Sequence, residues 1–507
     1  MASSKVVYVG MVADGIHHGH INIIEAARGL GTVIVGLLSD EAAASYKRPP
    51  ILPYEARRKI LENIKGISKV VQQDSLDYTD NIKKHRPDIL LHGDDWSDSK
   101  SKQHEARKLA ILAMAEVGGT VVDIPYTYGI STTEYISRVR LSGRSQKTYF
   151  GVNWLSKILE ENKRVLLITF SNIKKTMLMG DVAPYLKEKE TVHFCDFGPN
   201  VKIGDIESIL ASCSQFNPDA IVCIGGGTAI DMGKLLGVFL CNDIMGEISK
   251  KACDVIAMPT TTGTGSECTH FATMYVGDKK HSIENEFIRP DYVILDPALS
   301  KYLPARHRAS SGLDALCQGI ESYWARGATE ESMRYAELAI SLAINNLVEC
   351  VNSPNLSNTF SMLMAAHFSG KAIDISKTTL SHAISYPLTS KCGLPHGHAC
   401  ALTIGEVLKF NYKPRGDDFD QWHGDYGIAI KVSDILKFAG ADDPDDFKYV
   451  IDSLIDDVGL DNRFLRTLDD DEIKEISDSA HSSERCTNNP RKVTPHGIAH
   501  ILKKSRH

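Results

Sequence analysis

Residues 5 to about 130 alternate between short apolar runs and longer amphipathic segments. The apolar runs are rich in β-branched residues and occupy 5–12, 32–38, 69–73, 88–93 and 120–126. Segments with the helical spacing of apolar residues, such as 21–30 and 54–64, lie between them. Strands that alternate with helices in this way form a parallel sheet with helices on both faces. The pattern therefore predicts an α/β unit at the start of the chain.

A polar, basic segment with two glycines follows over 135–151, and it predicts a last helix and then a linker. The alternation then resumes, with apolar runs at 164–170, 191–198, 220–227 and 254–260. From Leu299 onward such runs vanish, and helical spacing continues to the end, as in 331–351. We therefore expect an α/β domain over 1–140, a linker over 141–153, a second α/β subdomain over 154–298 and a helical subdomain over 299–507.

Composition places the chain among ordinary globular proteins. Of its 507 residues, 24% are charged and 43% are hydrophobic, and the formal net charge is −7. This slightly acidic balance provides no electrostatic footprint for nucleic acid or an anionic membrane surface. No apolar run approaches the roughly 20 residues needed to cross a bilayer, and the start runs into a strand without a signal-peptide pattern.

The cysteines indicate a reducing environment. All eleven lie at Cys195 or later, their number is odd, and none forms a Cys-x-x-Cys pair. That usage favours free thiols over disulfides, zinc ribbons or redox dithiols. The cytoplasm is the expected location.

Two histidines bracket a glycine directly after the first apolar run. His17 and His20 enclose Gly19 where a helix is expected to begin. Imidazoles beside helix N-terminal amides can bind polyphosphate and stabilise charge that develops as a phosphoryl bond breaks. Near the end of the unit, hydroxyl residues at 131–133 precede another expected helix, where they either cap that helix or bind phosphate.

Four pieces of the first unit occur together in one order: HHGH at 17–20, YEAR at 54–57, HGDDW at 92–96 and GISTT at 129–133. With them the unit resembles the cytidylyltransferases of the HxGH class, related to the glycerol-phosphate and phosphoethanolamine enzymes. The resemblance implies binding of CTP with Mg²⁺, and catalytic roles for His17, His20 and Lys47 at the α-phosphate. The nucleotide-binding residues that it implies are Asp14 (near the acceptor), Gly19, Arg57, Gly93, Asp94, Asp95, Trp96, Gly129, Ile130, Ser131, Thr132 and Thr133.

One departure from that class concerns the acceptor. The glycerol-phosphate enzymes carry an arginine before the GISTT piece, whereas this chain has Tyr126 in PYTYGISTT. The variant is similar to cytidylyltransferase domains fused to phosphoenolpyruvate mutase, an enzyme of phosphonate biosynthesis. The resemblance therefore points to a phosphonate acceptor.

A second nucleotide site is indicated by a glycine turn at 225–227 and a hydroxyl-rich loop at 258–269. A glycine turn between strand and helix lets amides meet a pyrophosphate, although it can also serve tight packing alone. Together with LDPAL, GLDAL, PHGHACAL and NNPRKVT, these segments make residues 155–505 resemble the iron-containing (group III) alcohol dehydrogenases. The implied cofactor-binding residues are Phe170, Gly225, Gly226, Gly227, Thr228, Asp231, Thr260, Thr261, Thr264 and Ser266.

The cofactor is expected to be NADH or NADPH. NAD-specific members of that family carry an aspartate where this chain has Phe170, at the end of the first strand of the unit. Without a carboxylate to repel a 2′-phosphate, NADPH becomes acceptable.

The same resemblance implies a divalent metal, Fe²⁺ or Zn²⁺. The family holds it with an aspartate, a histidine four residues later and two histidines fourteen residues apart. Asp314, His382 and His396 match, but Gln318 stands in place of the first histidine and Tyr386 replaces a proton-transfer histidine. A glutamine oxygen can ligate a divalent ion, more weakly than imidazole, and Tyr386 could donate a proton or simply pack. The alternative for His382 or His396 is a structural role as a buried, hydrogen-bonded histidine.

The fold class implied is α/β: a Rossmann-like nucleotidyltransferase domain, then a dehydroquinate synthase-like iron-alcohol-dehydrogenase fold with a helical metal-binding part. With the glutamine in GLDALCQGIESYW, the alcohol-dehydrogenase part of the chain is most similar to the phosphonoacetaldehyde reductases. We therefore expect a bifunctional, homodimeric enzyme that reduces phosphonoacetaldehyde to 2-hydroxyethylphosphonate and couples the product to CTP. Two alternatives remain: a polyol- or glycerol-phosphate dehydrogenase/cytidylyltransferase that makes a CDP-alcohol, and a cytidylyltransferase with an inactive dehydrogenase-like scaffold.

Overall fold

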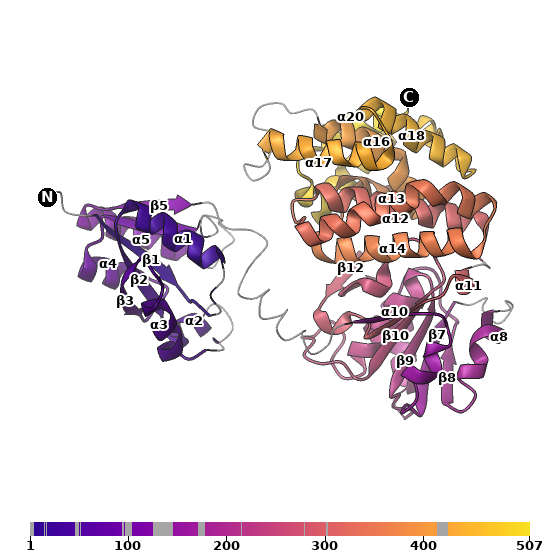
Figure 1. Cartoon of the computed structure of the whole chain (residues 1–507), viewed down its shortest axis with the longest axis horizontal. Coiled ribbons are helices and arrows are strands. Elements are labelled where there is room, and N and C mark those ends of the chain that lie inside the picture. The colour runs from indigo at the N-terminus through magenta and orange to yellow at the C-terminus, as the bar shows by residue number, and fades with distance from the viewer. Residues whose placement is uncertain are drawn as a thin grey trace. The chain divides into compact units, whose positions relative to one another are not determined.

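The computed structural model describes residues 5–14, 16, 18–45, 50, 52–93, 96, 104–124, 146–170, 178–213, 215–277, 279–300, 303–412 and 424–506. The chain forms two compact units, Met1–Gly143 and Arg144–His507 (Figure 1). No helix in the described part of the chain is long and apolar enough to span a membrane.

Unit 1 is a parallel five-stranded sheet in the order β3-β2-β1-β4-β5, with helices between its strands. Alternate residues of β1 enter different cores: Val7 and Val9 pack on one face of the sheet, and Tyr8 packs on the other. The sheet is thus buried on both faces, as the apolar runs predict. The elements are β1 (Val6–Met11), α1 (His18–Leu30), β2 (Thr32–Leu38), α2 (Asp40–Ala44), α3 (Tyr54–Glu62), β3 (Ile67–Gln73), α4 (Thr79–His85), β4 (Ile89–Gly93), α5 (His104–Val117) and β5 (Thr120–Ile124).

Unit 2 begins with a parallel six-stranded sheet in the order β6-β13-β10-β9-β7-β8. Its central strand β9 sends Ile221 and Cys223 into one core and Val222 and Ile224 into the other. An antiparallel hairpin of β11 and β12 is added beside it. The elements are β6 (Lys147–Phe150), α7 (Trp154–Ile158), β7 (Arg164–Thr169), α8 (Leu178–Val182), η3 (Ala183–Tyr185), β8 (Glu190–Phe194), α9 (Ile203–Cys213), β9 (Ala220–Gly225), α10 (Gly227–Phe239), β10 (Asp254–Pro259), η4 (Ser266–Cys268), β11 (Phe271–Val276), β12 (Lys279–Glu284), η5 (Glu286–Ile288), β13 (Tyr292–Leu295) and α11 (Pro297–Ser300).

The segment expected as a linker over 141–153 differs in the structure, because residues 147–150 form β6. This short edge strand pairs in parallel with β13, and Tyr149 packs against Trp154 and Tyr292. The side chain of Gln146 donates to the carbonyls of Glu267 and Pro290. An edge strand of four residues that follows a polar segment has little apolar patterning. The sequence therefore indicates a linker here.

The rest of unit 2 is helical. Helix α12 lies at its centre, since every residue from Leu313 to Trp324 is buried. A helix covered on all sides can hold polar residues only where they find partners, and α12 carries several candidate site residues. Figure 1 shows α12, α13 and α14 between the α/β part and the remaining helices. The helical elements are α12 (Ala305–Trp324), α13 (Glu330–Asn352), α14 (Leu356–Ser376), α15 (Leu380–Cys392), α16 (His396–Tyr412), α17 (Gly424–Ala439), α18 (Pro444–Asp457), η7 (Phe464–Thr467), α19 (Asp470–His481), η8 (Glu484–Asn488) and α20 (Pro495–Lys504).

Candidate active sites

The candidate site of unit 1 lies where the strand order reverses. Strands β1 and β4 are neighbours, and the chain leaves them toward opposite edges of the sheet. Ligands of open α/β sheets bind beside the carboxyl ends of strands at such a point. Asp14 and His20 follow β1, with His20 in the first turn of α1, and Gly93 ends β4. The topology thus brings together residues that lie far apart in the sequence.

Two of the expected nucleotide-binding residues are internal anchors. Arg57 is fully buried, and its guanidinium donates to Asp40 Oδ1 at 2.6 Å and to the carbonyls of Val12 and Leu52. It thereby ties the segment after β1 to α3. Trp96 is also fully buried.

The Trp96 ring stacks on His92, with centroids 3.8 Å apart, and its Nε1 donates to Asp123 at 2.7 Å. Asp14 is buried, and its Oδ1 accepts from the backbone of Leu52 at 3.1 Å. Nine expected residues lie outside the described residues: His17, Lys47, Asp94, Asp95, Gly129, Ile130, Ser131, Thr132 and Thr133. Of Gly19, the structure describes the backbone within α1. The nucleotide-binding roles remain predictions.

The candidate dinucleotide site of unit 2 lies at the corresponding reversal, between β7 and β9. A Cβ on Gly226 would lie 3.0 Å from Thr261 Cγ2, and one on Gly227 would lie 3.1 Å from Thr264 Cγ2. The glycine turn before α10 and the hydroxyl-rich loop after β10 are therefore in contact. Side chains at these glycines would crowd the space in which a pyrophosphate meets the amides of α10.

The surroundings of this turn also contain expected cofactor residues. Phe170 follows β7 and lies beside Gly225, whose carbonyl accepts from the buried Thr260 at 3.0 Å. Thr228 is half-buried in the first turn of α10. Asp231 faces the interior: it accepts from the Ser266 hydroxyl and from the backbone of Thr273 at 2.9 Å.

Lys234, which the sequence did not indicate, anchors the hydroxyl-rich loop through buried hydrogen bonds. Its fully buried ammonium donates to the carbonyls of Ser266 (2.9 Å) and Phe271 (2.6 Å) and to Thr269 Oγ1 (2.8 Å). Burial lowers its pKa, and Asp231 at 3.4 Å opposes that shift. A lysine one turn after Asp231 on α10 was the available signal.

The expected metal ligands meet between α12, α15 and α16. His382 Nε2 lies 3.3 Å from Asp314 Oδ1, and His396 Nε2 lies 3.9 Å from the same atom. Asp314 Oδ1 and His382 Nε2 are buried without a hydrogen-bond partner of normal geometry. Buried polar atoms that converge without partners fit a divalent cation, which would satisfy them together.

Glu321, which the sequence analysis missed, orients the His382 ligand. It lies seven residues after Asp314 on the same face of α12, and it accepts from His382 Nδ1. The carboxylate is fixed by the Thr379 hydroxyl at 2.9 Å and the Ser381 amide at 2.6 Å. A proton held on Nδ1 leaves the Nε2 lone pair for a metal. Burial raises the pKa of Glu321, but His382 and Thr379 outweigh it and lower that pKa.

The protonation state of His396 also suits a ligand. Partial burial lowers the pKa of His396, although Asp314 opposes the shift, so the imidazole is neutral at ordinary pH. Its Nδ1 lies 3.1 Å from the Ser385 hydroxyl, which leaves Nε2 directed toward Asp314. Metal binding needs such an unprotonated nitrogen.

A fourth possible donor is Cys400, which the sequence analysis also missed. It lies one turn after His396 on α16, and its Sγ and the donor atoms of Asp314, His382 and His396 are all within 4.8 Å of one another. Burial raises the pKa of the thiol, and His382 opposes that effect. Thiolate, imidazole and carboxylate together suit Zn²⁺ or Fe²⁺.

Gln318 connects the candidate metal centre to the cofactor loop. Its Oε1 accepts from the Ser369 hydroxyl at 2.9 Å, and its Nε2 lies 3.5 Å from the carbonyl of Thr264. Burial raises the pKa of Asp314, and the nearby amide of Gln318 is among the groups that outweigh burial and lower that pKa. Ligation of a metal by Gln318 remains a prediction.

Tyr386 lies flat against His396, with ring centroids 5.8 Å apart and planes 5° from parallel. Burial raises its pKa, but Lys280, Arg485 and His382 together outweigh burial and lower it. The phenol ring thus lies beside His396 in an electropositive setting, and its role as a proton donor remains a prediction.

Both units match known protein families. Residues 8–138 match the cytidylyltransferase-like family, residues 145–297 match the iron-containing alcohol dehydrogenases, and residues 308–506 match the C-terminal part of the Fe-containing alcohol dehydrogenase family.

Individual relatives cover most of unit 2. A phosphonoacetaldehyde reductase of Streptomyces viridochromogenes is 34% identical over 305 residues, which are 56% of this chain and 75% of that protein. An NAD-dependent methanol dehydrogenase of Bacillus methanolicus is 27% identical over 67% of this chain and 92% of its own. Among solved structures, a sulfoacetaldehyde reductase of Bifidobacterium kashiwanohense in complex with NAD⁺ superposes with a TM-score of 0.65, at 25% identity, over 72% of this chain and 97% of its own.

Proposed function

The chain belongs to the iron-containing alcohol dehydrogenase family and carries a cytidylyltransferase-like domain before it, and from this premise we propose a two-step enzyme of phosphonate biosynthesis. The first step reduces phosphonoacetaldehyde to 2-hydroxyethylphosphonate with NAD(P)H. The second joins that product to CTP, giving CMP-2-hydroxyethylphosphonate and pyrophosphate. The observation that carries the proposal is the relationship of unit 2 to a phosphonoacetaldehyde reductase in a chain that also contains a cytidylyltransferase-like domain.

The substrate class has support from two relatives. The Streptomyces enzyme is named for a two-carbon aldehyde with a phosphonate group, and the Bifidobacterium enzyme is named for one with a sulfonate group. An alcohol that bears a phosphonate is also a suitable acceptor for a cytidylyltransferase, because its oxyanion is a nucleophile. A simple alcohol made by reduction of propanal offers no such group.

In the reductase, Asp314, His382 and His396 would hold the metal, with Cys400 or Gln318 as a further donor. When bound, the metal supplies Lewis-acid polarisation of the aldehyde carbonyl, and NAD(P)H supplies the hydride. Tyr386 is proposed to donate the proton to the carbonyl oxygen as the hydride reaches the carbon.

In the transferase, a phosphonate oxygen attacks the α-phosphorus of CTP, a phosphoanhydride bond breaks, and pyrophosphate leaves. His17 and His20 are proposed to stabilise the charge on the α-phosphate during this displacement. Because His20 lies in the first turn of α1, the N-terminal amides of that helix face the same charge.

The proposal is tested one activity at a time with the full-length protein. Reduction of phosphonoacetaldehyde, followed through NADH or NADPH absorbance, should exceed that of propanal in kcat/KM. Pyrophosphate release with 2-hydroxyethylphosphonate should require CTP, and should fall with ATP, GTP or UTP. Preference for propanal, or no release with any of the four nucleotides, would overturn the corresponding step.

A further inference from the structure

The candidate metal centre opens to solvent on the side of His396. The side chain of His396 is 37% exposed, whereas those of Asp314 and His382 are 5% and 4% exposed. Tyr386 stacks on one face of the His396 ring. A substrate that approaches the centre from this side therefore passes Tyr386.

Two cations converge on Tyr386 from separate elements. Lys280 of β12 places its Nζ 4.0 Å from the centroid of the tyrosine ring. Arg485 of η8 lies near enough to the same residue that its charge helps to lower the pKa of Tyr386. Within the described residues, neither cation forms an ion pair with a carboxylate. An arginine and a lysine that face a solvent-accessible site without carboxylate partners are available for an external anion.

A third cation, Lys377, is held nearby by an unusual backbone. It follows α14 with φ 62° and ψ 175°, a backbone region that glycine favours and that is strained for other residues. The side chain of Asn488 clamps this turn, donating to the carbonyls of Ser376 at 2.8 Å and Thr378 at 3.0 Å. Since Asn488 and Arg485 both belong to η8, the clamp fixes the position of Lys377 relative to the arginine.

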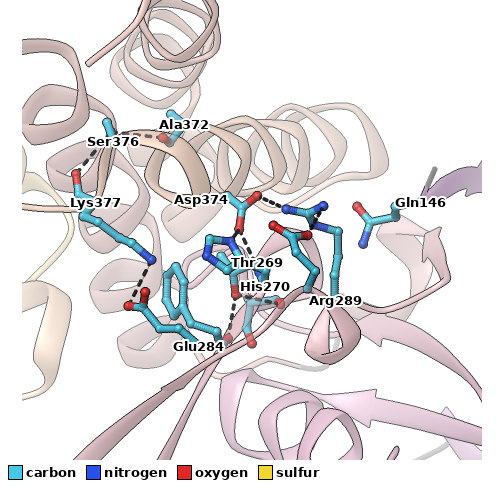
Figure 2. Close-up of polar contacts among 12 residues, drawn as sticks. Gln146, Thr269, His270, Glu284, Arg289, Ala372, Asp374, Ser376 and Lys377 are labelled. Carbon is cyan, nitrogen blue, oxygen red and sulfur yellow. Dashed lines mark hydrogen bonds and ion pairs between the residues drawn. The ribbon is translucent and has the colours of Figure 1, made fainter. Parts of the chain in front are cut away.

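The ammonium of Lys377 points to the hairpin that carries Lys280. Figure 2 shows it directed at Glu284 of β12, with 3.1 Å between its Nζ and Glu284 Oε1. It also lies 4.1 Å from the ring centroid of Phe271. Burial lowers its pKa, and the charge of Arg485 adds to that lowering while Glu284 opposes it.

The charges around this opening leave a positive excess. Glu284 offsets one cation, so two of the three positive charges have no negative partner among the described residues. A phosphonate carries up to two negative charges and three oxygens, which match two free cations and their several donors. Like charges held together in a partly buried place repel one another, and an anion bound between them relieves that repulsion.

We propose that Lys280 and Arg485 bind the tetrahedral anionic group of the aldehyde while its carbonyl faces the metal centre, and that Lys377 adds to the positive field beside them. The inference rests on the proposed function and names how the reductase selects its substrate. Only one methylene separates the carbonyl of phosphonoacetaldehyde from phosphorus, so the anion must be bound within a side-chain length of the ligands. Lys280 lies against the tyrosine that is stacked on His396, and the charge of Arg485 acts on the same tyrosine, so both cations lie beside the candidate ligands.

The direct test is binding of ethylphosphonate, an unreactive analogue, to the metal-loaded full-length protein with NADPH, measured by titration calorimetry. Loss of one charge-assisted contact should weaken binding about tenfold, so Lys280→Gln and Arg485→Gln should each raise Kd by that factor. The matched control is Lys279→Gln, which removes a charge from the opposite face of β12 and should bind as the wild type does. Arg485→Lys, which keeps the charge, should lose less than Arg485→Gln.

The preference for phosphonate over sulfonate and the effect of the variants on kcat/KM are measured in parallel. Ethanesulfonate in place of ethylphosphonate distinguishes a doubly charged from a singly charged ligand, and weaker binding of the sulfonate is expected. The ratio of kcat/KM for phosphonoacetaldehyde to that for propanal should fall about tenfold in Lys280→Gln. Unchanged Kd values in both charge-removing variants would overturn this inference while the wild-type preference for phosphonoacetaldehyde keeps the proposed function intact. A wild type that prefers propanal would instead overturn the proposed function.

Discussion

Glu321 accepts a hydrogen bond from Nδ1 of His382, and this pair fixes which nitrogen of the histidine faces Asp314. Carboxylates that orient a metal-binding histidine typically contribute 10–100-fold to metal affinity. Glu321→Gln should therefore weaken metal binding by about this factor, measured by competition with a chelator whose affinity is known. Glu337→Gln, at an exposed position of α13, is the control. Equal affinity in the two variants would show that Glu321 serves packing alone.

Cys400 should be a metal ligand in the loaded protein. Its Sγ shares a 4.8 Å cluster with the three expected ligands, and the oxygen of Gln318 already accepts from Ser369. Protein loaded with Co²⁺ should show a thiolate-to-cobalt charge-transfer absorption that Cys400→Ser removes. Cys195→Ser, at a half-buried thiol outside that cluster, should keep it. Wild-type protein without this absorption would exclude Cys400 and leave Gln318 or water in the fourth position.

Tyr386→Phe should lower kcat for aldehyde reduction by about 10²–10⁴, the usual contribution of a positioned proton donor. The phenylalanine ring can still lie against His396, so metal content should stay at the wild-type value. Rapid-mixing measurement of NAD(P)H consumption, together with metal analysis, separates the two effects. Full activity in this variant would assign Tyr386 a packing role.

Asp374 provides a test of stability against pH. It lies between His270 and Arg289, which are 2.6 Å from its two oxygens (Figure 2). Burial raises its pKa, but these partners outweigh burial and hold it below the ordinary value of 3.8. The carboxylate therefore stabilises the fold above pH 3.8, and this contribution is lost as pH falls through the lowered folded-state pKa.

Asp374→Asn should lower the free energy of unfolding by about 3 kcal/mol at neutral pH. This gap between the free energies of wild type and variant should narrow in acid. Urea unfolding at several pH values measures the gap. The exposed Asp243→Asn serves as control. A gap that is independent of pH down to strong acid would contradict the assignment.

The sequence predicts the fold class from a repeating pattern, and it predicts from motif spacing that three of the expected metal ligands lie together. His382 and His396 meet Asp314 as their spacing indicates. Glu321 and Cys400 follow a recognised ligand by seven and four residues on a helix, yet glutamate and cysteine at these spacings also occur in ordinary cores.

Other features depend on burial, which a motif does not reveal. The YEAR motif implies that Arg57 binds nucleotide, while the structure gives its guanidinium three internal acceptors. The cluster of Lys280, Lys377 and Arg485 joins residues more than ninety positions apart, so only the tertiary fold brings them together.

One chain is proposed to perform both steps on the same phosphonate. The decisive measurement is phosphorus NMR of the full-length protein incubated with phosphonoacetaldehyde, NADPH and CTP. We expect 2-hydroxyethylphosphonate to form first. A mixed phosphonate–phosphate anhydride with CMP should then appear together with pyrophosphate, and both of these later products should require CTP. Reduction that stops at the alcohol, with CTP unconsumed, would contradict it.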